Sequence, residues 1–163
     1  MLVRIDDLMD IQEKLDSRIF KLHNTSREET KKDRILALLV ELGECANETR
    51  TFKYWSTKEA SPLDVIAEEF SDVVHFMLSL GIDAQIETRE IKPLDTDKSL
   101  SDLFLRAYQL ATSLLSDFSK KTLLDIYQIV FTIAKNLEID PQSIRENYLL
   151  KNKINHERQD NHY

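Results

Sequence analysis

Apolar residues recur along this chain at intervals of three and four positions, the spacing of one face of an α-helix. This pattern predicts six helical segments. They cover residues 5–22, 26–50, 62–80, 103–114 and 123–137, and the last runs from 141 towards the end of the chain. Residues 83–97 are polar and carry no periodic pattern, so we expect a surface connection there.

Residues that favour helix starts precede three of these segments. Ser26, with a glutamate three positions later, forms an S-x-x-E capping box. Ser61-Pro62 and Asp140-Pro141 each place an N-cap residue before a proline at the first helical position. We therefore expect one all-α domain over residues 1–163, a bundle of about six helices.

Composition supports this fold class. The chain of 163 residues has 2 Gly and 3 Pro, whereas average usage is about 7% Gly and 5% Pro. β-sandwiches and doubly wound α/β folds use glycine in their turns, so the scarcity argues against both. Two isolated glycines also exclude a glycine-rich phosphate-binding loop.

Charge and cysteine content narrow the class of protein. The formal net charge of −7 argues against a partner such as duplex nucleic acid. The single cysteine, Cys45, allows neither an internal disulfide nor a Cys-x-x-Cys zinc site. The opening residues, MLVRIDDLMD, are acidic where a signal peptide is basic and then apolar, and no apolar stretch is long enough for a membrane span. We expect a cytoplasmic protein with no membrane partner.

Carboxylates on two consecutive predicted helices are the first feature that points to chemistry. Glu41, Glu44 and Glu48 share one face of the second helix. On the third helix, Glu69 lies within the apolar stripe and Asp72 lies at its edge, one turn along. An ionised carboxylate in such a place is costly unless it is paired or bound to a cation. The third helix contains no Lys or Arg that could pair with it.

A bound metal ion would offset the cost of placing these ionised carboxylates in an apolar environment. If the second and third helices pack antiparallel, their acids can face one another and raise one another's pKa, and a divalent cation removes that penalty. Oxygen ligands without His or Cys favour Mg²⁺ or Mn²⁺ over Zn²⁺, so we expect the metal site between these helices. The alternative is a structural acid neutralised by an arginine from elsewhere, such as Arg34 or Arg106.

The closing segment, YLLKNKINHERQDNHY, carries cationic and amide side chains at one-turn spacing. Lys151, Asn155, Arg158 and Gln159 share one face of the last predicted helix. These groups recognise phosphates and amides, although cations in a last helical turn also suit the helix dipole alone. Beside an acidic metal site, they suggest a polyphosphate held between Mg²⁺ and basic side chains.

These motifs resemble those of a known family. The ExxE pair at 41–44 and the ExxD pair at 69–72 are similar to the signature of the all-α nucleotide pyrophosphohydrolases, which MazG-like enzymes share. Three further strings resemble those of the dimeric dUTP diphosphatases within this group. They are FKYW at 52–55, EFSDVVHF at 69–76 and KNKINHERQDNHY at 151–163.

This resemblance implies an all-α homodimer that hydrolyses dUTP, and also dUDP, to dUMP. Glu41, Glu44, Glu69 and Asp72 would coordinate Mg²⁺ ions that bridge the phosphates, with Mn²⁺ as an alternative. Glu44 would also orient and deprotonate the attacking water.

The same resemblance implies the groups that bind the rest of the nucleotide. Lys151, Asn155, Arg158 and Tyr163 would hold the phosphates, with Lys53 a weaker candidate, and Gln12, Trp55, His75 and Phe76 would form the uracil pocket. An aromatic ring can stack the base and an amide can read its edge. Two positions depart from the family pattern: Asp16 stands where Asn is usual, and His162 where Gly is usual. An ionised aspartate accepts hydrogen bonds but cannot donate them.

Other interpretations stay open. Trp55 can fill the corner between two helices, Gln12 can be an exposed helix residue, and Phe76 can belong to the core. His75 lies on the polar side of its helix, where it would be solvated. Two other functions fit the pattern: a MazG-like hydrolase of other nucleotides, and a non-catalytic helical interaction protein. The latter predicts a Lys or Arg paired with Glu69.

Overall fold

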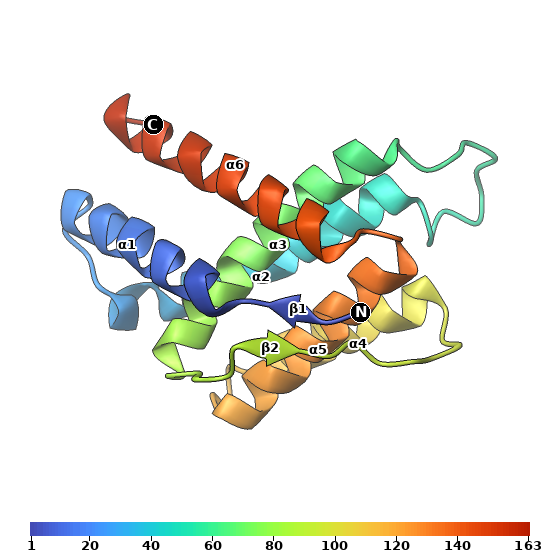
Figure 1. Cartoon of the computed structure of the whole chain (residues 1–163), viewed down its shortest axis with the longest axis horizontal. Helices are drawn as coiled ribbons and strands as arrows, with labels where there is room; N and C mark the ends of the chain where they lie inside the picture. Colours follow the sequence, from blue (N-terminus) through green and yellow to red (C-terminus); the bar gives the residue numbers. More distant parts are fainter.

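The computed structural model describes residues 1–163 and contains six α-helices (Figure 1). They are α1 Asp6–Leu22, α2 Arg27–Thr49, α3 Leu63–Asp83, α4 Leu100–Ser113, α5 Lys120–Asn136 and α6 Pro141–Asp160. The prediction of a single all-α domain is confirmed. No helix is both long and apolar enough to span a membrane.

The expectation of a surface connection over residues 83–97 is wrong in part. Glu90–Ile91 forms the short strand β2, which pairs antiparallel with β1 (Val3–Arg4). The apolar residue of each strand, Val3 and Ile91, is buried in the hydrophobic core. Strands of two residues are too short to produce a periodic pattern, which is why the sequence did not indicate them.

The start of α3 differs from the prediction, whereas those of α2 and α6 agree with it. The side chains of Ser26 and Asp140 accept hydrogen bonds from backbone N–H groups in the first turns of α2 and α6, as N-caps do. In α3, Pro62 itself stands at the N-cap position, and the hydroxyl of Ser61 donates to Glu48. This contact ties the start of α3 to the end of α2.

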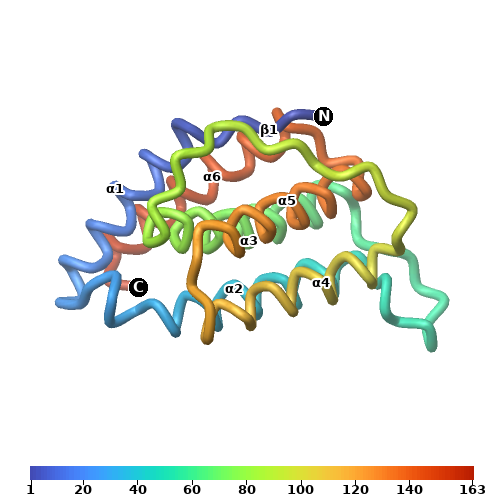
Figure 2. Tube along the Cα trace, turned by 90° about the horizontal axis from the view of Figure 1, so that it is seen from below, coloured from blue at the N-terminus to red at the C-terminus, as the bar shows by residue number.

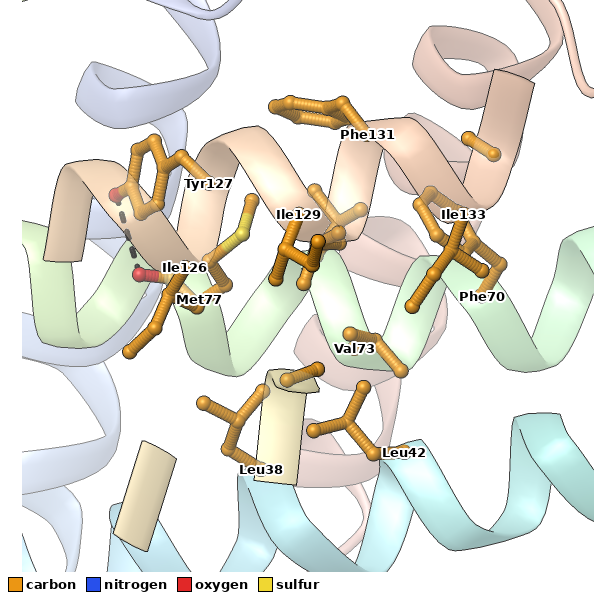
Figure 3. Packing of buried hydrophobic residues seen from close by; sticks show 14 of the residues in the cluster. Leu38, Leu42, Phe70, Val73, Met77, Ile126, Tyr127, Ile129, Phe131 and Ile133 are labelled. Carbon is orange, nitrogen blue, oxygen red and sulfur yellow. Dashed lines mark hydrogen bonds between the residues drawn. The ribbon is translucent and has the colours of Figure 1, made fainter. Parts of the chain in front are cut away.

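The end of α3 also lies beyond the predicted stop. The helix continues to Asp83, beyond the end predicted at residue 80, so Gly81 is an interior residue. A Cβ atom at position 81 would lie 1.8 Å from the hydroxyl oxygen of Tyr127. That hydroxyl donates to the backbone oxygen of Met77 at 3.1 Å (Figure 3). Gly81 therefore allows the close approach of α5 to α3.

Helix α3 lies at the centre of the bundle. It packs against α2 and α5, while α4 packs against the same two helices, so that α2 and α4 lie side by side beneath α3 and α5 (Figure 2). On the remaining side, α1 and α6 contact α3 and one another. Apolar side chains from α2, α3 and α5, such as Leu42, Val73 and Ile133, fill the interior (Figure 3). One cluster of 34 buried hydrophobic residues forms the core.

Candidate active site

Antiparallel packing of α2 and α3 brings acids from both helices together, as the spacing predicts. Carboxylate oxygens of Glu41, Glu69 and Asp72, one from each residue, all lie within 4.8 Å of one another. Each of these residues is half-buried, whereas Glu44, one turn along from Glu41, is exposed. We call Glu41, Glu69 and Asp72 the carboxylate cluster.

The electrostatics of this cluster favour a bound cation. Burial, contact with the Glu44 side chain and the charge of Asp72 raise the pKa of Glu41 to about 8. Burial and the neighbouring charge of Asp72 raise the pKa of Glu69 as well. One oxygen of Glu41, Oε2, is buried and has no hydrogen-bond partner. Three oxygen donors with an unpartnered buried oxygen among them fit a divalent ion such as Mg²⁺ or Mn²⁺.

A lysine from α6, and not an arginine, pairs with the cluster. The ammonium of Lys151 lies 2.9 Å from Asp72 Oδ2 and 3.4 Å from Glu68 Oε1, and its side chain is only 10% exposed. Glu69 has no salt bridge, which is contrary to the expectation for a purely structural acid. The two arginines considered as partners lie elsewhere. Arg34 pairs with Asp83 at 2.7 Å, and Arg106 donates to Gln109.

A cavity of about 300 Å³ adjoins the carboxylate cluster between α1, α2, α3 and α6. Asp72 belongs to both the cluster and the cavity wall. The size is at the lower end of the range for small-molecule pockets. The side chains that line the cavity come from several helices. They include Asp16 from α1, His75, Phe76 and Ser79 from α3, and Asn155 from α6.

The structure brings two of the four proposed base-binding residues to this cavity. His75 and Phe76 line it, with their rings packed edge to face at a centroid distance of 5.1 Å. The expectation of a solvated His75 is wrong: the residue is 7% exposed, because α1 and α6 cover that side of α3. Gln12 is fully buried behind the wall and does not line the cavity. Trp55 lies in the connection between α2 and α3, 64% exposed and packed against Phe52.

A buried polar network stands behind the cavity wall. The amide nitrogen of Gln12 donates to Asp16 Oδ1 at 2.8 Å and lies 3.3 Å from Nε2 of His75. Tyr148 donates to the amide oxygen of Gln12 at 2.8 Å. The second oxygen of Asp16 accepts hydrogen bonds from Ser79 at 2.6 Å and from a guanidinium nitrogen at the start of α2 at 3.0 Å. The Ser79 and Tyr148 contacts could not be predicted from the sequence, because neither residue belongs to a recognisable motif.

The proposed phosphate-binding residues take different positions on α6 and its end. Asn155 and Tyr163 line the cavity, whereas Lys151 is bonded to Asp72 beside it. Arg158 is exposed, donates to Asn155 at 3.4 Å, and lies with its guanidinium carbon 4.8 Å from the centre of the Tyr163 ring. Lys53, the weaker candidate, lies in the α2–α3 connection and is not part of the cavity wall.

His162, one of the two departures from the family pattern, has a left-handed backbone conformation. His162, where glycine is usual, has a φ of 56°, in the left-handed region that glycine adopts without steric cost. The turn places the aromatic ring of Tyr163 against the cavity and beneath Arg158.

These features define an all-α protein in which a carboxylate cluster, suited to a divalent cation, adjoins a cavity for a small molecule. A family model described as dUTPase matches residues 4–163, and the chain belongs to this all-α, dimeric dUTPase family. The family indicates dUTP diphosphatase activity and is metal-dependent, in agreement with the resemblance of the motifs. No curated protein matches the chain.

Proposed function

We propose that this chain hydrolyses dUTP, and also dUDP, to dUMP with Mg²⁺ as its cofactor. Mn²⁺ is the expected substitute, since it takes the same oxygen ligands. The observation that carries the proposal is the convergence of three carboxylates within 4.8 Å, one of which, Asp72, also lines the adjoining cavity. Membership of the dUTPase family indicates that the substrate is dUTP.

The residues of the two acidic pairs would hold the cofactor. Glu41, Glu69 and Asp72 supply converging oxygens, and Glu44 would complete the set from the exposed side. A divalent cation bound there would polarise the phosphoryl oxygens of the nucleotide and offset their charge. Because Glu41 has a pKa of about 8 in the absence of a cation, its carboxyl must lose a proton when the cation binds at neutral pH.

Glu44 is the proposed general base. Its carboxylate is exposed and lies beside Glu41, so it can reach a water molecule at the open side of the cluster. We assign it the orientation of the attacking water and the acceptance of its proton at a carboxylate oxygen. Nucleophile positioning of this kind supplies a large part of the rate in phosphoryl transfer.

Side chains on α3 and α6 would hold the nucleotide. Phe76 would stack the base within the cavity, with His75 beside it. Asn155 and Tyr163 would contact the phosphates from the cavity wall, and Arg158 would approach them from the exposed side. Lys151, bonded to Asp72 at 2.9 Å, stands between the cluster and this surface and can donate to a phosphate oxygen.

We propose that the chain acts as a homodimer, with part of α2, α4 and their neighbouring loop covered by a second copy. Several large apolar side chains are exposed on this side: Leu36, Val40, Phe52, Trp55 and Leu105. A shallow apolar groove between α2 and α4, lined in part by Phe52 and Leu105, continues the surface. Exposed apolar patches of this kind mark protein interfaces. Size-exclusion chromatography with light scattering tests this assembly, and a monomer would refute it.

Hydrolysis of a panel of nucleotides tests the function. The canonical deoxynucleoside triphosphates, UTP and dUDP are incubated with the protein and Mg²⁺ or Mn²⁺, and released phosphate and pyrophosphate are measured. We expect selective turnover of dUTP and dUDP that stops when a chelator is added. Broad turnover would support a MazG-like hydrolase instead, and absence of turnover would support a helical interaction protein.

Glu69→Gln is the variant that tests the site. It should abolish turnover and leave the helical circular dichroism unchanged, because it removes a half-buried carboxylate without changing its shape. Glu87→Gln, in the exposed connection after α3, is the matched control and should retain full activity. Full activity in Glu69→Gln would remove that residue from the site.

A further inference from the structure

The C-terminal ends of α1 and α6 extend beyond the buried core. The last buried residue of α1 is Asp16 and that of α6 is Asn152, although the helices continue to Leu22 and Asp160. Both ends project on the same side of the molecule (Figure 1). Because neither end has a fully buried side chain, their relative position depends largely on polar contacts.

Arg18 makes most of these polar contacts. One of its guanidinium nitrogens donates to the backbone oxygen of His156 at 3.1 Å and lies 3.0 Å from Nδ1 of the same residue. Because a guanidinium group has no acceptor, Nδ1 must accept this hydrogen bond. The other terminal nitrogen of Arg18 forms an ion pair with Asp160. A single arginine on α1 thus holds two successive turns of α6.

A second contact joins the same two ends. Nε2 of His23, the residue after α1, lies 2.9 Å from Oε1 of Gln159. An amide oxygen only accepts hydrogen bonds, so Nε2 donates this one. We call these contacts of Arg18 and His23 with the end of α6 the α1–α6 clip.

The turns of α6 that the α1–α6 clip holds also carry residues of the cavity wall. Asn155 and Gln159 line the cavity, and so does Tyr163. The backbone N–H of Tyr163 donates to the carbonyl oxygen of Arg158 at 2.9 Å, so the end of the chain follows these turns. A shift of the turns would carry Asn155, Arg158 and Tyr163 away from the cavity together.

We propose that Arg18 is a positioning residue, which fixes the last two turns of α6 so that their phosphate-binding side chains meet the nucleotide. Arg18 does not line the cavity, so it acts through the residues that it holds. The proposal rests on the proposed function, since it takes these side chains of α6 as phosphate ligands. A protein whose binding-competent arrangement is only partly populated binds its ligand more weakly in proportion. Loss of the α1–α6 clip therefore raises KM and leaves kcat nearly unchanged.

The opposite ends of the same two helices provide a matched comparison. There Arg145 of α6 pairs with Asp7 of α1, and its side chain is 45% exposed, against 33% for Arg18. At that end, however, buried side chains also join the helices, and the hydroxyl of Tyr148 donates to the backbone oxygen of Leu8 at 3.4 Å. The Arg145 ion pair is therefore not needed to position α6.

Kinetics and hydrogen exchange of two arginine variants test the proposal. Arg18→Gln should raise KM for dUTP by about 10-fold and leave kcat within about 2-fold of its original value. Backbone amides of residues 156–160 should exchange faster in this variant, whereas those of residues 144–151 should not change. Arg145→Gln, the matched control, should alter neither KM nor the exchange of residues 156–160.

Asp160→Asn separates positioning from simple attraction of the phosphates. If Arg18 acted only through its charge, removal of the neighbouring negative charge would lower KM. Positioning predicts the opposite: Asp160→Asn should raise KM by about 3-fold, and the double variant should be no worse than Arg18→Gln alone.

The outcomes distinguish this proposal from the proposed function. An unchanged KM in Arg18→Gln, equal increases in Arg18→Gln and Arg145→Gln, or a lower KM in Asp160→Asn would overturn the positioning role while leaving dUTP hydrolysis intact. Failure of the unmodified protein to hydrolyse dUTP would refute both.

Discussion

Replacement of Lys151 by methionine removes the ammonium group that lies against the carboxylate cluster while keeping most of the apolar stem. In the structure Nζ lies 2.9 Å from Asp72 Oδ2. A cation held by that carboxylate at about 2.1 Å would lie within about 5 Å of the ammonium. With an effective dielectric constant of about 20, a divalent ion and a unit charge at that separation repel by about 7 kcal/mol.

Only part of this repulsion should be measurable, because the lysine stem can move and solvent screens the charges. If about a third remains, the metal affinity of Lys151→Met rises by about 10- to 100-fold, at about 1.4 kcal/mol for each factor of ten. The assay is a calorimetric titration with Mg²⁺ or Mn²⁺ in the absence of nucleotide. It is run above the Glu41 pKa of about 8, so that protons do not compete for the carboxylates.

Lys153→Met is the matched control. That ammonium is 73% exposed and 4.0 Å from Glu157, so its removal changes the net charge equally but lies away from the cluster. The control should change metal affinity by less than about 3-fold, since exposed charges are screened. If Lys151→Met binds the ion no more tightly than Lys153→Met, the Lys151 ammonium does not compete with the metal ion for the carboxylates.

Three further predictions concern pH, packing and the C-terminal helix. Because the raised pKa of Glu41 makes the folded metal-free protein bind more protons than the unfolded chain, its thermal stability should fall as pH rises from about 4.5 to about 8. Glu41→Gln should flatten this dependence in thermal denaturation. Gly81→Ala should lower the free energy of unfolding by about 1–3 kcal/mol in urea titrations, because its Cβ meets the buried Tyr127 hydroxyl. Gly43→Ala, 2.8 Å from a half-buried tyrosine hydroxyl that can move, should be nearly neutral. Arg158→Ala should lower kcat/KM for dUTP by at least ~10-fold without changing metal affinity.

Each of these predictions has an outcome that contradicts it. An unchanged pH dependence in Glu41→Gln would show that another group titrates. Equal effects of the two glycine substitutions would show that the contact with Tyr127 does not limit packing. Weakened metal binding in Arg158→Ala would argue against a phosphate-binding role for that residue.

Local patterns in the sequence were sufficient to predict the helices and the convergence of the acids. Helical periodicity depends on residues three and four positions apart, and the ExxE and ExxD pairs each lie within one turn. Antiparallel packing of α2 and α3 then follows from their short connection, and it brings Glu41 to Glu69 and Asp72. These features require no knowledge of distant segments.

Features that depend on contacts distant in the sequence could not be predicted. A helical wheel places His75 on a polar face, but only the packing of α1 and α6 buries it. Lys151 pairs with Asp72 across α3 and α6, so neither helix alone indicates the ion pair. The predicted third helix stops at residue 80, before Gly81, because the tyrosine that requires a glycine at position 81 lies on α5 and is distant in the sequence.

Arg27 donates both to Asp16, at the cavity, and to Asp83, at the end of α3, each at 3.0 Å. An exchange of Asp16 for a neutral residue would leave this guanidinium with one carboxylate instead of two, inside a partly buried site. Positions 16 and 27 should therefore covary among relatives, with a cation at 27 accompanying an acid at 16. To introduce this pocket into a relative with asparagine at position 16, both Asp16 and Arg27 would have to be substituted together.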